Sequence, residues 1–269
     1  MDNRNEGNWE TINRNRDFMK FTSLEKFQAL QTSVKTDQTK KLPQPPLGYP
    51  CKGQITELEC GFDCDMNISY ANLLDLRRSV RVFDENIQIT QKQLAFLLWS
   101  AQGVQEIRGN NYATFRPVPS GGARHPFELY FIAISVEGLK QGIYRYAPLE
   151  HTGEKRAAIE YKSDIENCDT IISEIFLHYP PKNASLILLI SCVAYRAEWR
   201  YGHMAHRAML IDLGHVGQNI MLSSAALGLG SCCYAAYDQD LCDQLLCLDS
   251  HEEYTVYVCS AGSISKQRL

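Results

Sequence analysis

The segment RRSVR, residues 77–81, gathers three arginines and one serine in five residues. A guanidinium group presents paired N–H donors that match the oxygens of a phosphate, and a serine hydroxyl adds a further donor. Arginines near the end of a helix also complement the negative end of its dipole. The segment therefore indicates either a solvated helix end or a site for a phosphate-bearing ligand.

Three further segments could complete such a site. In RPVPSGGARHP, residues 116–126, the glycines would let a flat ligand approach the backbone, although the segment alone predicts only a turn. ALGLGSC, residues 226–232, resembles a dinucleotide-binding glycine loop, but it follows a helical pattern rather than a strand, which argues against a Rossmann loop. The closing SKQRL carries two cations separated by one residue, as a frayed basic tail also would.

The histidines do not form a convincing catalytic pattern. His203, His206 and His215 lie on one predicted helix, but neither a nucleophile elbow nor a paired acid at suitable spacing accompanies them. His203 and His206 have no third metal ligand nearby in the sequence. We therefore expect neither a hydrolase triad nor a metal site.

Composition and charge exclude several classes of protein. The chain has 269 residues, a formal net charge of −4 and 45% hydrophobic residues, which is typical of a globular protein without a strongly basic surface. The N-terminus lacks an apolar secretion signal, and the most apolar run, residues 184–194, is about half the length of a membrane helix. We therefore expect a cytoplasmic protein that binds neither membrane nor nucleic acid. Its ten cysteines are expected to be reduced, and those nearest to zinc spacing lack a second pair: Cys51, Cys60 and Cys64.

Apolar periodicity and turn residues predict the elements that must position these segments. Residues 1–68 form an arm with a proline-rich connector, KLPQPPLGYP, whereas residues 69–269 form the domain. A capping box at Thr90 and Gln93 opens a helix that Gly103 ends. The patterns predict helices at 69–79, 91–102, 163–177, 204–228 and 238–248, and strands at 127–136, 142–148, 184–194 and 253–262.

The predicted helix at 204–228 is apolar on most of its surface. One of its faces consists mainly of small residues: Leu210, Gly214, Gly217, Met221, Ser224 and Gly228. A second face is larger and apolar: Met209, Leu213, Val216, Ile220 and Leu227. Such a helix is central to a core, and small residues let another backbone come close. Close packing within one chain and the core of a dimer both explain the pattern.

Taken in order, these segments resemble the flavin-dependent nitroreductase superfamily, and its SagB-type dehydrogenase branch in particular. The similar segments are RRSVRVF, LLWSAQGV, PSGGARHPFELY, GIYRYAP, DLGHVGQNIMLSSAALGLG and the closing KQR. They cover the chain from about residue 70 to its end. The resemblance implies a nitroreductase-like α+β fold, in which helices flank a central sheet, and an intertwined homodimer with FMN at the subunit interface.

The resemblance assigns RRSVR to the cofactor. Arg77, Arg78 and Ser79 would contact the FMN phosphate and ribityl chain, while Arg81 would face the N1–O2 edge of the flavin. Reduced flavin carries negative charge at this edge, so Arg81 would act in catalysis as well as in binding.

The other cofactor-binding residues implied by the resemblance come from three segments. Pro119, Ser120 and Gly121 would come from the other subunit. Leu229 and Gly230 would lie under the ring, and Lys266 and Arg268 would hold the phosphate.

Two departures from the family pattern bear on the substrate. Ala123 and His125 stand where many nitroreductases carry asparagine and glutamine before a proline. SagB-type members that oxidise azoline rings are expected to use a Lys–Tyr pair, and the nearest match is Arg200–Tyr201, whose arginine stays protonated. Tyr201 is a candidate catalytic residue that would donate to the substrate or orient it, with a purely structural role as the alternative.

The expected function is that of an FMN-dependent oxidoreductase. NAD(P)H would pass a hydride to flavin N5, and an organic acceptor would then take it from the same pocket in ping-pong order. One alternative is a dehydrogenase that oxidises a substrate such as a peptide azoline, with the flavin reoxidised by oxygen. An alternative of another class is a flavin-binding module without turnover.

Overall fold

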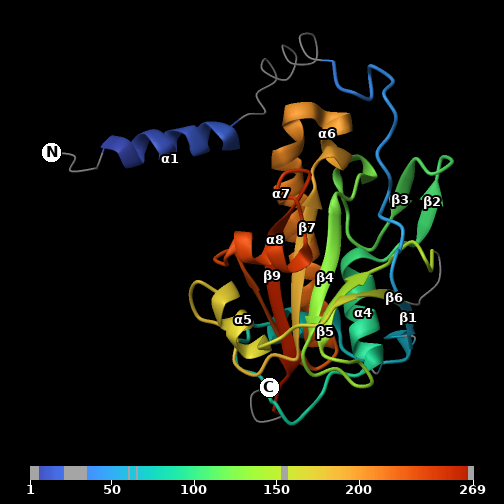
Figure 1. The fold of residues 1–269 in the computed structure, drawn as a ribbon, viewed down its shortest axis with the longest axis vertical. Coiled ribbons are helices and arrows are strands. Elements are labelled where there is room, and N and C mark those ends of the chain that lie inside the picture. The colour runs from blue at the N-terminus through green and yellow to red at the C-terminus, as the bar shows by residue number, and fades with distance from the viewer. Residues whose placement is uncertain (1–5, 21–34, 60, 65, 153–156, 266–269) are drawn as a thin grey trace.

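The computed structural model describes residues 6–20, 35–59, 61–64, 66–152 and 157–265, and one antiparallel sheet lies at its centre (Figure 1). The strand order is β1-β6-β5-β4-β7-β9-β8. These strands are β1 (Ile55–Leu58), β4 (Phe127–Ala133), β5 (Gly142–Tyr146), β6 (Ala157–Ser163), β7 (Leu186–Val193), β8 (Leu229–Tyr234) and β9 (Glu253–Ser263). The expected α+β class is confirmed.

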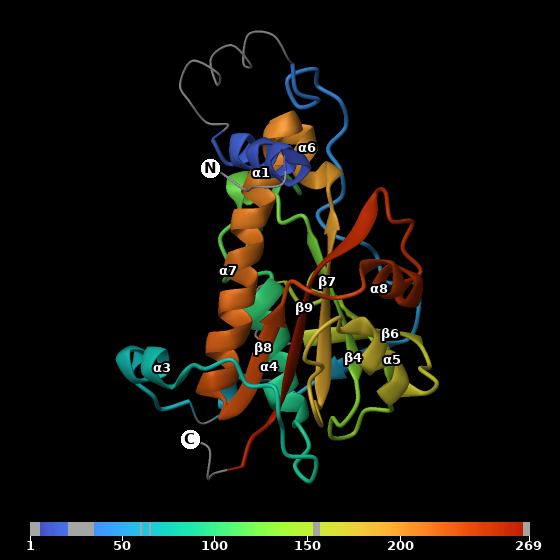
Figure 2. The same cartoon turned by 90° about the vertical axis from the view of Figure 1, so that its left-hand side faces the viewer.

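Helices cover both faces of the sheet (Figures 1 and 2). On one face α4 (Gln91–Gln102) and α7 (Ala205–Ala226) enclose a large apolar core, and on the other α5 (Cys168–Ile175) and α8 (Gln239–Leu246) enclose a second. Every residue of β7 is buried, because both faces of this central strand are covered. No helix among the described residues is long and apolar enough to cross a membrane.

Shorter elements lie at the periphery. They are the helices α1 (Glu6–Met19), α3 (Tyr70–Leu76) and α6 (Tyr195–Tyr201), the hairpin of β2 (Glu106–Arg108) and β3 (Ala113–Phe115), and 3-10 turns at Gly61–Asp63, Gly121–Ala123 and Gly202–Met204. None of the residues of α3 is buried. Ser69 caps this helix, and RRSVR follows its last residue, as the sequence predicts.

Most of the predicted elements are present. The capping box of α4 is confirmed, because the Gln93 N–H donates to Thr90 Oγ1 at 3.2 Å and the Thr90 N–H donates to Gln93 Oε1 at 2.9 Å. The helix predicted at 163–177 is shorter, since β6 continues to Ser163 and α5 begins only at Cys168. The sequence patterns missed α1, α6, β1, β2, β3, β6 and β8.

Two glycines on the small-residue face of α7 have different surroundings. A Cβ atom at Gly217 would lie 2.7 Å from Cε1 of Tyr257 in β9, so this glycine lets the helix pack closely on its own sheet. Within-chain packing is therefore the explanation for Gly217. Gly214 has open space around it, and the neighbouring Leu210 and Ile211 are 58% and 54% exposed.

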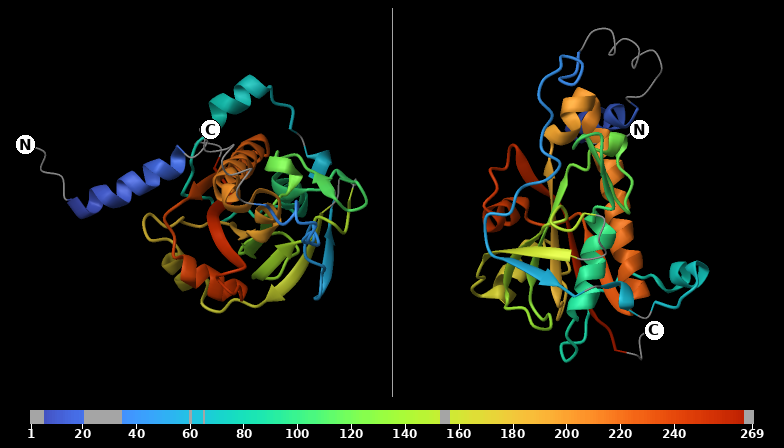
Figure 3. Two further views of the ribbon diagram at one scale, coloured as in Figure 1. Left: turned by 90° about the horizontal axis from the view of Figure 1, so that it is seen from above. Right: turned by 90° about the vertical axis from the view of Figure 1, so that its right-hand side faces the viewer.

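Residues 35–54 of the arm run along the outside of the domain, and residues 55–58 join the sheet as β1 (Figures 1 and 3). Buried side chains of the domain donate hydrogen bonds to the backbone carbonyls of the arm. Arg116 Nη2 donates to Leu47 O at 3.3 Å, and Trp199 Nε1 donates to Leu42 O at 3.0 Å. These bonds fix the proline-rich connector to the domain surface.

A row of buried charges lies beneath the arm. Glu128 in β4 accepts from Arg196 at 2.6 Å and from Arg145 at 3.4 Å, and Arg145 also donates to Glu160 at 2.9 Å. These side chains are only 2–4% exposed. Arg145 also donates to two backbone carbonyls of the arm, those of Tyr49 and Pro50. A buried charge is costly unless it is paired and hydrogen-bonded, so the row depends on every partner.

Replacing Glu128 by glutamine should strongly destabilise the fold. The change keeps the shape of the side chain but leaves two buried guanidinium groups with one carboxylate fewer. We expect the free energy of unfolding in urea to fall by about 3–5 kcal/mol. The matched control is Glu106→Gln, whose carboxylate pairs with Arg108 in an exposed position and should matter little. Equal effects of the two variants would contradict the assigned role of the buried row.

Candidate functional site

The RRSVR segment lies beside the edge strand β8. Ser79 forms a parallel bridge with Ser231, and the Val80 N–H donates to Ser231 O at 2.9 Å. A Cβ atom at Gly230 would lie 2.8 Å from side-chain atoms of Val80 and Ile264, so only glycine allows this approach. The structure therefore brings together two of the predicted segments, 77–81 and 229–230, and places Ile264 beside them.

The three arginines of this segment lie in different surroundings. Arg78 folds back onto α3, where its Nη1 donates to the carbonyls of Asp75 and Arg77. The Arg81 guanidinium lies 5.8 Å from the centre of the Tyr234 ring. Among the described residues, no carboxylate lies within ion-pair distance of Arg77 or Arg81. Lys266 and Arg268 lie outside the described residues.

The predicted loop at Pro119–Gly121 lies at the other end of α7. Asp212 Oδ2 accepts from the Ser120 hydroxyl at 2.7 Å and from the Gly121 N–H at 2.9 Å. The loop continues with positive φ at Gly122, Ala123 and His125, a conformation that costs on the order of 1–3 kcal/mol at each non-glycine residue. Strain of this kind persists where surrounding contacts over-determine the backbone, and it often marks a functional site.

Arg200 and Tyr201, the match to the Lys–Tyr pair, lie against this loop. A Cβ atom at Gly122 would lie 2.5 Å from the Tyr201 hydroxyl and 2.7 Å from Arg200 Nε. Arg200 Nη1 donates to the hydroxyl of Tyr112 at 2.6 Å. Tyr112 follows the turn of the β2–β3 hairpin, and no sequence signal pointed to it. Tyr201 is half-buried and fills the space that Gly122 leaves.

The two groups of predicted residues do not meet within one chain. Figure 2 shows α3 beside the C-terminal end of α7 and α6 beside its N-terminal end. Asp212, which holds the Ser120 loop, and Leu227, just before β8, are separated along α7 by a rise of about 22 Å. A site that uses both groups therefore needs residues from two chains.

Residues 74–263 match the model of the Nitroreductase family, which decides the classification. The chain belongs to this family. The superfamily and the α+β fold expected from the sequence are thereby confirmed.

Three relatives extend this result. MJ1384, a nitroreductase-family protein of Methanocaldococcus jannaschii, is 30% identical over 65% of the chain and 82% of its own length. The trifolitoxin-processing protein TfxB of Rhizobium leguminosarum is 30% identical over 52% of the chain, and the microcin B17-processing protein McbC of Escherichia coli is 25% identical over 57%. The chain spans only 38% of TfxB and 56% of McbC. These processing proteins agree with the expected SagB-type branch.

Two solved structures share the fold. The E. coli McbBCD microcin synthetase complex, with truncated pro-MccB17 bound, has a TM-score of 0.57 at 18% identity and covers 93% of this chain and 97% of its own. A nitroreductase-family protein from Exiguobacterium sibiricum, in complex with FMN, has a TM-score of 0.52 at 12% identity and covers 76% and 91%.

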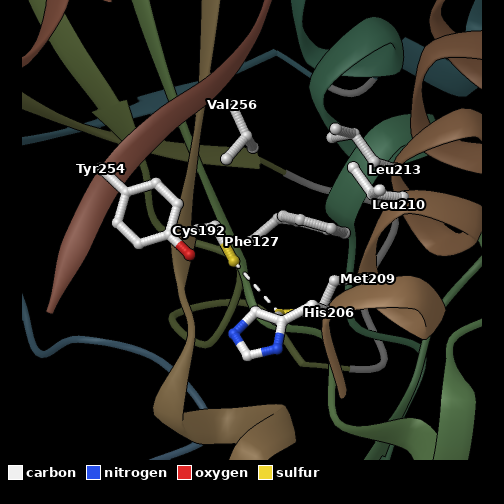
Figure 4. A pocket seen from close by; sticks show the side chains of 8 residues that line it. All are labelled: Phe127, Cys192, His206, Met209, Leu210, Leu213, Tyr254 and Val256. Carbon is white, nitrogen blue, oxygen red and sulfur yellow. Dashed lines mark hydrogen bonds between the residues drawn. The ribbon is translucent and has the colours of Figure 1, made fainter. Parts of the chain in front are cut away.

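An apolar pocket of this nitroreductase-family chain is lined by none of the predicted site residues. It opens between the N-terminal half of α7 and strands β4, β7 and β9 (Figure 4). Eight residues line it: Phe127, Cys192, His206, Met209, Leu210, Leu213, Tyr254 and Val256. Burial raises the pKa of Cys192 to about 12, so its thiol is protonated and is not an activated nucleophile.

The weak metal patterns find no support in the described part of the chain. His206 Nε2 lies 2.9 Å from Glu198 Oε1, and no three His, Cys, Asp or Glu side chains among the described residues could hold a metal ion. Cys51 is a free thiol, while Cys60 lies outside the described residues.

His125 is a neutral base held between cations. Burial, together with the positive charges of Arg116 and Arg124, lowers the pKa of His125 to about 2, although its ring also donates to the Thr114 carbonyl. The imidazole is therefore uncharged at neutral pH. The backbone N–H of His125 donates to the Ser120 hydroxyl at 3.0 Å, so His125 supports the loop rather than supplying a proton.

The fold should lose stability in acid partly through His125. An unfolded histidine binds a proton near pH 6.5, whereas folded His125 does not until about pH 2, so folding becomes less favourable as pH falls below 6.5. This contribution is about 1.4 kcal/mol per pH unit. We expect the free energy of unfolding in urea to depend less steeply on pH between 7 and 5 in His125→Gln than in wild type, by about one proton. The exposed His251→Gln should match wild type, and parallel curves for all three proteins would contradict the assignment.

Proposed function

We propose that this chain is an FMN-dependent oxidoreductase that acts as a cytosolic homodimer. Family membership supports a flavin-linked oxidoreductase, and an FMN complex is known for a protein of the same fold. The observation that carries the proposal is the convergence of residues 77–81 on Leu229 and Gly230, with the Ser120 loop at the opposite end of α7. Two copies related by a two-fold axis would bring both ends into each of two sites.

The donor set fits a phosphate-bearing cofactor. Arg77 and Arg81 lack carboxylate partners among the described residues, and Ser79 is exposed beside them. A dianionic phosphate would complement these cations in a chain whose net charge is −4. We assign Arg77, Arg78 and Ser79 to the phosphate and ribityl chain, with Lys266 and Arg268 completing the clamp.

The remaining assignments follow the positions of the other segments. Leu229 and Gly230 would support the ring, and the partner chain would contribute Pro119, Ser120 and Gly121. Bound FMN supplies a position, N5, that accepts and returns a hydride. Arg81 would place positive charge beside the N1–O2 edge, where negative charge gathers on reduction. The strained Ser120 loop, fixed by Asp212, would hold the partner's cofactor and exclude water on that side.

We propose NAD(P)H as the electron donor, with an organic acceptor taking its turn in the same pocket. A second candidate function is a SagB-type dehydrogenase that oxidises a peptide-derived ring and is reoxidised by oxygen, which the similarity to TfxB and McbC favours. Purified protein tests the proposal directly. A yellow FMN spectrum that NADH or NADPH bleaches without oxygen supports the reductase, and bleaching by substrate alone supports the dehydrogenase. A flavin that neither bleaches would leave only a binding module.

Replacing Arg81 by glutamine should slow flavin reduction while leaving FMN bound. The neutral side chain keeps hydrogen-bond donors but removes the charge that favours the reduced cofactor. We expect the anaerobic bleaching rate to fall by about tenfold or more, which corresponds to a barrier higher by about 1.4 kcal/mol. Arg81→Lys is the matched control and should recover much of the rate. An unchanged rate in Arg81→Gln would place Arg81 away from the flavin edge.

Deleting residues 265–269 should weaken FMN more than riboflavin. Lys266 and Arg268 are separated by one residue, so in an extended tail their side chains point the same way, and charge-assisted bonds contribute about 1.5–3 kcal/mol each before solvent screening. Titration of the truncated apoprotein should show an FMN affinity lower by about tenfold or more. Riboflavin, which lacks the phosphate, is the control ligand. Unchanged FMN affinity would remove the tail from the site.

A further inference from the structure

The hydroxyl of Tyr112 receives hydrogen bonds from two different segments. Gln38 Nε2, in the arm, donates to Tyr112 Oη at 2.7 Å, and Arg200 Nη1, in α6, donates to the same oxygen at 2.6 Å. A neutral phenol oxygen has two lone pairs and one hydrogen. Both lone pairs are occupied, so the hydroxyl hydrogen must point away from both donors.

No acceptor for this hydrogen lies among the residues that the structure describes. Tyr112 is 36% exposed, so the hydrogen is presented to the surroundings of the site rather than to the core. The tyrosine is therefore oriented to donate outward. A group held in this way discriminates in favour of ligands that carry a hydrogen-bond acceptor.

The rest of Tyr112 is held just as firmly. The Arg124 guanidinium stacks 4.8 Å from the centre of its ring and also donates to the Tyr112 carbonyl. Gln44, a second arm residue, donates to the same carbonyl at 3.1 Å. Because ring, backbone and hydroxyl are all fixed, the direction of the free donor is fixed before any ligand binds.

Tyr112 borders the loop that the proposed function assigns to the partner's flavin. Arg200, which donates to Tyr112, lies against Gly122, and Gly122 follows the Ser120–Gly121 pair directly. Arg124 links the two parts, because its Nε donates to Gly122 O at 3.0 Å. A molecule lying beside the flavin on this side would therefore meet Tyr112.

We propose that Tyr112 is a substrate-binding residue whose hydroxyl donates to a carbonyl oxygen of the substrate. Gln38 and Arg200 are positioning residues that act through it, so the N-terminal arm forms part of the substrate site. The inference rests on the proposed flavin function. Quinones and peptides both carry suitable carbonyl oxygens, and the experiment distinguishes these two sources.

The test compares two electron acceptors with FMN-loaded, full-length protein. Menadione, a quinone, offers carbonyl oxygens, whereas ferricyanide takes electrons one at a time and needs no docked carbonyl. In Tyr112→Phe the KM for menadione should rise roughly three- to tenfold, the effect of one neutral hydrogen bond, while ferricyanide turnover stays within about twofold of wild type. Tyr179→Phe is the matched control, because Tyr179 is 81% exposed on the connection before β7.

A second variant tests the positioning residues. Gln38→Glu replaces a donor by an acceptor that captures the Tyr112 hydrogen, so it should raise the menadione KM as much as Tyr112→Phe does, with FMN content unchanged. Arg200→Lys keeps a cationic donor, so its KM for menadione should stay close to the wild-type value. A merely structural role for these residues predicts equal losses with both acceptors, and that result would overturn the proposal.

The source of the carbonyl is read from inhibition. If N-acetylglycine methylamide, a blocked peptide, competes with menadione in wild type but not in Tyr112→Phe, the site takes a peptide carbonyl. An effect confined to menadione assigns it to quinones. Wild-type kinetics with menadione in Tyr112→Phe would refute the inference. A wild-type protein whose flavin transfers no electrons to ferricyanide would instead refute the proposed function.

Discussion

The packing of α7 against the sheet fixes where each part of the candidate site lies. Met209, Leu213, Val216 and Ile220 bury their side chains along the helix, and each contributes about 1.5–3 kcal/mol relative to an exposed position. Gly217 brings the helix close to Tyr257. The helix is therefore held along its length, with the Ser120 loop near one end and the β8 edge near the other. Because the helix is rigid, the two groups of candidate residues stay at opposite ends of α7, and a flavin site that uses both would draw on two chains.

The helices and strands that carry a capping residue or a clear apolar pattern were predicted from the sequence. Thr90, Gln93 and Gly103 define both ends of α4, and the uninterrupted apolar run of β7 reports a strand that is buried on both faces. The missed elements lack such signals. The segment of β8, LGSCCY, contains no apolar alternation, and its pairing with β9 comes from the tertiary fold. The two strands of the hairpin β2–β3 have three residues each, too few to establish a period.

The candidate site was predictable where one contiguous motif carries it. RRSVR, the Ser120 loop and Leu229–Gly230 could be recognised as segments, and the structure brings the first and the last of these together. Tyr112 and Gln38 could not be recognised, because they meet only through a contact between residues 74 positions apart. The small-residue pattern of α7 was ambiguous for a related reason, since a glycine that admits its own sheet and one that admits a partner look the same in sequence. Gly217 and Gly214 differ only in what lies beside them.

The arm contributes both to the stability of the fold and to the proposed site. Arg116, Arg145 and Trp199 donate to arm carbonyls, and a buried donor left without its acceptor costs about 1–3 kcal/mol. Arg116 is the strongest case, because its bonds go to neutral acceptors and burial lowers its pKa to about 10. Removing the arm would therefore leave these buried N–H donors without the carbonyl acceptors that the arm supplies. Trp199 also holds Gln38 near Tyr112, because the Gln38 N–H donates to Trp199 O at 2.8 Å while Trp199 Nε1 donates to Leu42 O at 3.0 Å. The segment of the arm that accepts hydrogen bonds from buried donors thus also carries Gln38, which donates to Tyr112, so the arm need not fold separately in order to act in the proposed site.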